Sequence, residues 1–92
     1  MRPETLVVLG SSVTALAMVR SAHALGVHAE LVDVEDGVAF ATRLATREPR
    51  FAWPRAAVLN ELAARHHGRR AWRVATTDEW LRAMRTAPGL AA

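Results

Sequence analysis

Two short polar stretches follow apolar runs in this chain and could contact a ligand. Gly10, Ser11 and Ser12 come directly after an apolar run over residues 6–9. Asp33 ends a second apolar stretch. Unpaired backbone N–H groups at a helix start bind anions, and a carboxylate can accept hydrogen bonds from ribose hydroxyls. These residues therefore predict a site for an anionic or polar ligand.

Residues 10–15 have the spacing of a dinucleotide-binding fingerprint, but only its first glycine is present. Ser12 and Ala15 stand where the second and third glycines would be. Ser12 adds a Cβ where the backbone would approach a pyrophosphate, whereas Asp33 follows at about the distance of a ribose-binding acid. Three interpretations stay open: a strand-to-helix turn that needs one glycine, a contact to another ligand, and an NAD or FAD site.

The elements that would position these residues form a β-α-β unit. Residues 6–9 predict a buried strand, and residues 27–33 predict a second one. Between them, residues 12–25 predict a helix with Ser11 or Ser12 as its N-cap and Gly26 just past its end. Such a unit nearly always crosses over right-handed and makes the strands parallel. Asp33 should therefore lie beside the Gly10 loop, at the carboxyl edge where α/β sheets bind ligands.

The middle of the chain shows weaker periodicity. Residues 38–47 predict a short helix or an irregular loop, and residues 48–54 predict an extended or turning segment because residues before proline avoid helical angles. A helix should then start at Pro54, reach His67 and end at Gly68. Its predicted apolar face consists of Val58, Leu59, Leu62, Ala63 and His66.

The last part of the chain predicts a strand over residues 71–75 and a final helix. Thr76 as N-cap and Glu79 as N3 form a predicted capping box, and Pro88-Gly89 would end the helix. Its predicted buried residues are Trp80, Leu81 and Met84. The 92 residues therefore predict one α/β domain: a small three-layer Rossmann-like fold with a short parallel sheet of three to four strands.

Composition restricts the compartment and the partners. The chain has no cysteine, and its start becomes charged too soon for a signal peptide or a membrane span, so we expect a cytoplasmic protein. The formal charge is +3, and all 12 basic residues are arginine. This usage is typical of a GC-rich genome and does not by itself predict nucleic-acid binding. In the basic run over residues 65–73, we expect a buried Trp72 and solvated arginines.

Catalytic and metal signatures do not emerge from the residues themselves. His66 and His67 are neighbours on a predicted helix and diverge by about 100°, so they cannot share one metal ion without help. Ser11 and Ser12 have no evident base, and no paired carboxylates or P-loop lysine can be assembled. The chain alone therefore predicts no catalytic residues and no metal site.

With these elements in place, the chain resembles the N-terminal, pre-ATP-grasp domain of ATP-grasp enzymes, in particular of the carboxylate-amine ligases. Residues 7–21 are similar to the family's Gly-Gly-x-x-x-Gly-Leu-x-x-x-Arg-Ser opening, with Ser11 and Ala15 in place of glycines. Thr42-Arg43 resembles its Ser-Arg pair after the second strand, and residues 72–80 resemble its strand followed by Thr-x-Asp-Glu. The motifs run in the family's order over nearly all of residues 1–92.

The resemblance implies a non-catalytic domain that helps to enclose a substrate. Family enzymes activate a carboxylate as an acyl phosphate, with ATP and Mg²⁺ held by domains that follow this one. The chain would then be a fragment, a split subunit or a relic whose partner is an ATP-grasp catalytic chain or another copy of itself. The implied substrate-binding residues are Gly10, Ser11, Ser12, Asp33 and Arg43. A small nucleotide-binding or dinucleotide-binding half-Rossmann module is the alternative.

One feature of the residues independently predicts a partner. The helix over residues 12–25 is apolar on most of its circumference, and a single small sheet can cover only one side of it. We therefore expect exposed apolar surface on this helix.

Overall fold

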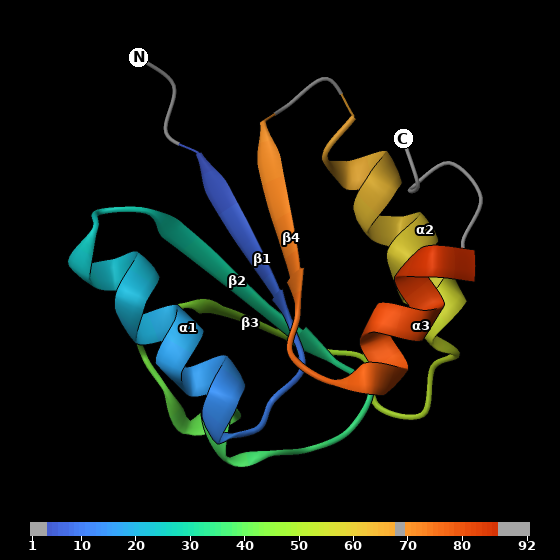
Figure 1. Cartoon of the computed structure of the whole chain (residues 1–92), viewed down its shortest axis with the longest axis horizontal. Coiled ribbons are helices and arrows are strands. Elements are labelled where there is room, and N and C mark those ends of the chain that lie inside the picture. Colours follow the sequence, from blue (N-terminus) through green and yellow to red (C-terminus); the bar gives the residue numbers. More distant parts are fainter. Residues whose placement is uncertain (1–3, 68–69, 87–92) are drawn as a thin grey trace.

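A computed structural model describes residues 4–67 and 70–86. The chain forms a sheet between two helical layers (Figure 1). The elements are, in order, β1 (Thr5–Leu9), α1 (Val13–Ala24), β2 (His28–Asp33), the 3₁₀ helix η1 (Val38–Ala41), β3 (Thr46–Pro49), α2 (Arg55–Arg65), β4 (Ala71–Ala75) and α3 (Asp78–Thr86). The helix α2 ends at Arg65 with His66 as its C-cap, two residues before the predicted last residue His67. The predicted helix-ending residues Gly68 and Pro88-Gly89 lie outside the described residues.

The sheet has four parallel strands in the order β3-β2-β1-β4. Figure 1 shows α1 on one face of the sheet and α2 and α3 on the other. This arrangement confirms the predicted α/β class, the three layers and the parallel β-α-β unit. The carboxyl ends of all four strands share one edge, so the loops after Leu9, Asp33, Pro49 and Ala75 are brought together there.

The strand β3 was not predicted. The 3₁₀ helix η1 fits the short helix expected within residues 38–47, and the turn at residues 51–52 fits the expected turning segment, but a strand that begins at Thr46 was not expected. Residues 46–49 are polar and end in a proline, so they carry no apolar alternation that would mark a strand. They form one because the exposed edge of β2 offers hydrogen-bond partners, with Glu30 opposite Thr46 and Asp33 opposite Pro49. A short, charged, proline-ended strand is also what protects a sheet edge from pairing with other chains.

The core consists of two layers of side chains, one on each face of the sheet. On the α2 and α3 face, Val7, Leu9 and Val32 pack under side chains from the helices, which include Val58, Leu59, Leu62 and Trp80. These helical residues confirm most of the predicted apolar faces, although Leu81 is 41% exposed rather than buried. On the other face, Val8, Ala29 and Leu31 pack under Ala15, Val19 and Ala22 of α1.

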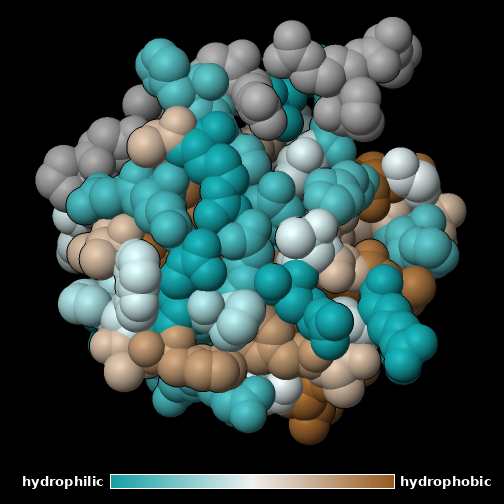
Figure 2. All heavy atoms as spheres, turned by 180° about the vertical axis from the view of Figure 1, so that it is seen from behind, coloured by the Kyte–Doolittle hydropathy of each residue, from teal (hydrophilic) through white to brown (hydrophobic). Residues whose placement is uncertain are grey.

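The first helix has exposed apolar side chains, as expected. Val13 at its start and Leu25 at its C-cap are both exposed, whereas Met18 is only partly covered. Ser12 occupies the predicted N-cap position without a side-chain capping bond, and Gly26 has the predicted left-handed conformation with a φ of 73°. Figure 2 shows the molecule from behind, with hydrophilic residues across the middle of the surface and hydrophobic ones below them and along one side.

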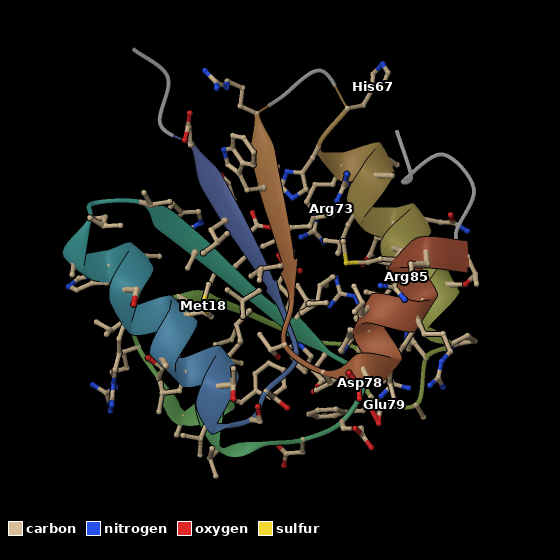
Figure 3. All side chains as sticks on the ribbon, viewed as in Figure 1. Met18, His67, Arg73, Asp78, Glu79 and Arg85 are labelled. Atoms are coloured by element: carbon tan, nitrogen blue, oxygen red, sulfur yellow. The ribbon has the colours of Figure 1, made fainter. Side chains whose placement is uncertain are left out.

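The capping of α3 differs from the predicted capping box. Thr77, not Thr76, is the N-cap, and its Oγ1 accepts a hydrogen bond of 3.2 Å from the backbone N–H of Trp80. Thr76 instead donates from its Oγ1 to the carbonyl oxygen of Leu9 at 2.9 Å. Asp78 and Glu79 follow in the first turn, where negative charge favours the helix dipole (Figure 3). The helix therefore starts one residue later than predicted, because the hydroxyl of Thr76 is hydrogen-bonded to the end of β1.

Replacing Thr77 by alanine should lower the free energy of unfolding by about 1 kcal/mol, because the N–H of Trp80 loses its acceptor. Urea unfolding followed by circular dichroism measures this loss. Thr77→Ser is the matched control, since serine keeps the hydroxyl and should retain most of the stability. Equal losses in the two variants would show that the methyl group, not the cap, supplies the effect.

Candidate functional site

The Gly10 turn connects β1 to α1 and is shaped by the protein's own β4-α3 loop. Gly10 has a φ of +130°, and its N–H donates to the carbonyl oxygen of Val32 at 2.9 Å. A Cβ at this position would lie 2.0 Å from Oγ1 of Thr76. The space that a missing Cβ provides is thus filled by a threonine of the same chain. Glycine is required here by internal packing and by the backbone angle.

Ser11 and Asp33 form a buried contact at the carboxyl ends of β1 and β2. Oγ of Ser11 donates to Oδ2 of Asp33 at 2.6 Å, and the carbonyl oxygen of Glu35 lies 3.1 Å from the same hydroxyl. Both residues are only 4% exposed. The sequence prediction that Asp33 lies beside the Gly10 loop is therefore correct in space.

The second oxygen of Asp33 is used by two further groups of the protein. Oδ1 accepts hydrogen bonds from the backbone N–H of Val34 at 2.7 Å and from Nε1 of Trp80 at 2.9 Å. Within the described residues no cation forms an ion pair with this carboxylate, so three neutral donors hold its charge. We call Ser11, Asp33 and Trp80 the aspartate hub. It joins the β1-α1 turn, the end of β2 and α3.

The loop after β2 covers Ser11 from another side. The backbone carbonyl oxygen of Ser11 accepts a hydrogen bond of 2.9 Å from the N–H of Ala39 in η1. A Cβ on Gly37 would come within 2.3 Å of that same carbonyl oxygen. The glycine at position 37 therefore allows the loop to lie directly against Ser11.

The other two predicted site residues lie on the surface. Ser12 is exposed at the start of α1, and Arg43 is exposed on the turn after η1. In the described part of the chain, the side chain of Arg43 makes no hydrogen bond or ion pair. The structure thus brings Gly10, Ser11 and Asp33 together and leaves Ser12 and Arg43 open to solvent.

An open cavity lies farther along the same edge, at the end of β3. It has a volume of about 300 Å³ and is lined by Phe40, Arg47, Pro49 and Phe51. We call it the β3 cavity. Residues 38–54 show no regular periodicity, so the cavity could not be predicted from a periodic pattern. The signal that could have found it is a pair of phenylalanines in a polar, proline-containing segment.

A network of ion pairs ties α2 to the strands β2 and β3. Arg65 contacts Glu48 at 2.5 Å and Glu30 at 3.5 Å, while Arg50 contacts Glu48 at 3.0 Å and Glu61 at 2.9 Å. The hydrogen bond to Glu61 raises the pKa of the Arg50 guanidinium above its ordinary value. Arg65 was expected to be solvated, and it instead pairs with glutamates of β2 and β3 and holds α2 against the edge of the sheet.

The histidines at the end of α2 have different surroundings. Nε2 of His66 lies 3.0 Å from Oε1 of Glu30 and is largely buried, whereas His67 is exposed and points away from the sheet (Figure 3). Across residues 4–67 and 70–86, no three His, Cys, Asp or Glu side chains are grouped as a metal site would require. In the same ranges, no helix has the length and apolar character needed to cross a membrane.

Comparison with protein-family models, curated proteins and solved structures found no match. The resemblance to the pre-ATP-grasp domain therefore rests on the motifs of the chain alone.

The geometry of the Gly10 turn bears on which ligands this edge can take. A dinucleotide would need the Gly10 backbone for its pyrophosphate and Asp33 for its ribose. The side chain of Thr76 fills the space beside the Gly10 backbone, and the carboxylate of Asp33 already accepts hydrogen bonds from Ser11 and Trp80. Exposed polar groups remain on either side of this filled centre, at Ser12 and at the β3 cavity.

Proposed function

We propose that this chain is a non-catalytic, pre-ATP-grasp-like domain that acts with an ATP-grasp catalytic chain and helps to enclose its small-molecule substrate. ATP and Mg²⁺ would be bound by the partner. The proposal combines the ordered motifs of the chain with one structural observation, the uncovered apolar groove between α1 and β4.

This groove has a volume of about 230 Å³ and lies on the α1 face of the sheet. Its lining includes the apolar residues Leu6, Met18, Leu25, Val27 and Trp72 and the polar residues Glu4 and Ser21. Trp72 is 56% exposed and Leu25 is 79% exposed, which corrects the expectation of a buried Trp72. Figure 3 shows Met18 on the side of α1 that faces the sheet. The groove is therefore an apolar surface that the described residues leave partly open to water.

The position of β4 explains why the groove is open. In the register of the sheet, Trp72 lies opposite Leu6 and Val74 lies opposite Val8, so both point to the α1 face. That face carries the single helix α1 beside η1, whereas the opposite face carries α2 and α3. Among the described residues, β4 is also an edge strand that pairs with β1 alone. A partner element that packs beside α1 would bury the indole of Trp72.

The alternative of a half-Rossmann module that binds a nucleotide has less support from the geometry. Its two main contacts, the Gly10 backbone and Asp33, are engaged within the chain. Calorimetry with NAD(H), FAD and ATP distinguishes the two functions. Saturable heat that is lost in a Ser12→Val variant would favour the nucleotide module.

The partner proposal is tested by affinity purification of the tagged full chain from its own cells, followed by mass spectrometry. We expect an ATP-grasp chain to be recovered with the wild type and lost with Leu25→Glu, which places a charge in the groove. Val38→Glu is the matched control, because Val38 is equally apolar, is 60% exposed and does not line the groove.

Addition of the purified chain to the recovered partner should also raise its substrate-dependent release of ADP. Recovery of proteins without an ATP-grasp domain, or equal recovery with both variants, would contradict the proposal. Sedimentation that shows only copies of this chain assembled through the groove would assign the surface to a homo-oligomer instead.

A further inference from the structure

The β3 cavity combines aromatic rings with a cation, and its residues come from three successive segments. Phe40 belongs to η1, Arg47 and Pro49 belong to β3, and Phe51 follows on the turn toward α2. The centres of the two phenyl rings are 6.0 Å apart and the rings are perpendicular. Phe40 is partly buried against the core on the α1 face, whereas Phe51 is 53% exposed, so the ring of Phe51 has most of the surface open to a third ring.

The guanidinium of Arg47 is positioned but not neutralised. Its NH1 donates to the carbonyl oxygen of Phe40 at 3.2 Å, which holds it beside the first ring. Among the described residues, no carboxylate lies within 4.0 Å of it. Arg50, three residues later, contrasts with it: two glutamates pair with Arg50, and its guanidinium lies 5.5 Å from the ring centre of Trp53. Arg47 therefore retains N–H groups for an external anion.

The turn that presents Phe51 is held in an uncommon conformation. Ala52 has a φ of 65°, which residues other than glycine rarely adopt. The N–H of Ala52 donates to the carbonyl oxygen of Val34 at 3.1 Å. The N–H of Trp53 donates to the carbonyl oxygen of Arg50 at 3.0 Å. These bonds fix a turn that leaves Phe51 53% exposed. Backbone conformations of this kind cluster at functional sites.

We propose that the β3 cavity binds a monocyclic aromatic anion, with its ring against Phe40 and Phe51 and its anionic group on the guanidinium of Arg47. The volume of about 300 Å³ is at the small end of the range for ligand sites, so it suits one ring with a carboxylate or phosphate better than a dinucleotide. An arginine guanidinium can bind a carboxylate or a phosphate through two parallel hydrogen bonds. This site is separate from the Gly10 turn and does not depend on a catalytic partner.

The experiment uses the isolated full chain and four small probes in nuclear magnetic resonance titrations. Benzoate and phenyl phosphate carry both a ring and a charge, benzamide carries the ring alone, and acetate carries a charge alone. We expect saturable shifts with benzoate or phenyl phosphate, centred on residues 40–51, and much weaker binding of benzamide and acetate. The tighter of the two aromatic anions identifies the anionic group that the site prefers.

Two variants and one control assign the binding to named side chains. Arg47→Gln and Phe51→Ala should each weaken binding of the better probe by about tenfold, since a charge-assisted hydrogen bond and an aromatic contact each contribute on that scale. Arg20→Gln, an exposed arginine on α1, removes the same charge and should leave the affinity unchanged. Unfolding midpoints verify that each variant is folded.

Several outcomes would overturn the assignment. The wild type could show no saturable binding, acetate could bind as tightly as benzoate, or Arg20→Gln could weaken binding as much as Arg47→Gln. If Arg47→Gln fails to fold, Phe51→Ala decides alone, because its side chain is on an exposed turn. Since no partner is present, a failure here leaves the proposed ATP-grasp association unaffected, and the converse also holds.

Discussion

Replacing Asp33 by alanine is expected to lower the free energy of unfolding by about 3 kcal/mol, one of the two largest losses that we predict. The substitution removes the acceptor of Ser11, of the Val34 N–H and of Trp80 Nε1. The hydroxyl of Ser11 can turn to the carbonyl oxygen of Glu35, but the two N–H groups stay buried without partners. A domain of this size has about 5 to 10 kcal/mol of stability in total, so a large part of it would be lost.

Asp33→Asn is the matched control for this variant. Its side-chain oxygen can still accept from Val34 and Trp80, while its amide group meets a hydroxyl that can donate elsewhere. We therefore expect a loss of about 1 kcal/mol. Urea unfolding followed by tryptophan fluorescence measures the free energy of unfolding of both variants. An alanine variant as stable as the asparagine variant would show that the buried N–H groups find other partners.

Replacing Gly10 by alanine is expected to cost about 3 to 5 kcal/mol for two separate reasons. The φ of +130° is strained for any residue with a Cβ, and that Cβ would lie 2.0 Å from Oγ1 of Thr76. Because the hydroxyl is held by the carbonyl oxygen of Leu9, it cannot move away without losing its own hydrogen bond. The prediction is checked by the unfolding midpoint of purified Gly10→Ala.

A double-mutant cycle separates the steric contribution from the backbone contribution. Thr76→Ala removes the clashing oxygen, after which the nearest side-chain atom, the Cβ of residue 76, would be 3.4 Å from the new Cβ. Gly10→Ala should therefore cost about 1 to 3 kcal/mol less in the Thr76→Ala background than in the wild type. If the two substitutions lower the free energy of unfolding additively, the cost of Gly10→Ala comes from its backbone conformation, and the β4-α3 loop moves away from the new Cβ at little cost.

In this Rossmann-like sheet, the protein's own side chains close the central crevice at the carboxyl ends of β1 and β2. The groups that elsewhere contact a nucleotide here connect β1, β2 and α3. Sites available to other molecules lie away from this closed centre. The groove lies on the α1 face near the amino ends of β1 and β4, and the cavity lies at the end of β3. The first bears on the proposed partner and the second on the proposed small ligand.

The sequence alone determined the elements that have strong local signals. The apolar runs before Gly10 and Asp33, the helix between them and the glycine at position 26 were sufficient to predict a parallel β-α-β unit. Because crossover connections have one hand and parallel strands end at one edge, the sequence also placed Asp33 beside Ser11.

The tertiary structure decided everything that depends on distant partners. The polar strand β3 forms because β2 supplies its hydrogen-bond partners. Thr77 caps α3 because the hydroxyl of Thr76 donates to the carbonyl oxygen of Leu9. Trp72 is exposed because it lies on the α1 face of the edge strand β4, which carries the single helix α1 beside η1. Asp33 became an internal hub because the sheet brings Trp80, 47 residues away, to its second oxygen. Periodicity and capping rules act over a few residues, whereas these hydrogen bonds and contacts form only after the layers have packed.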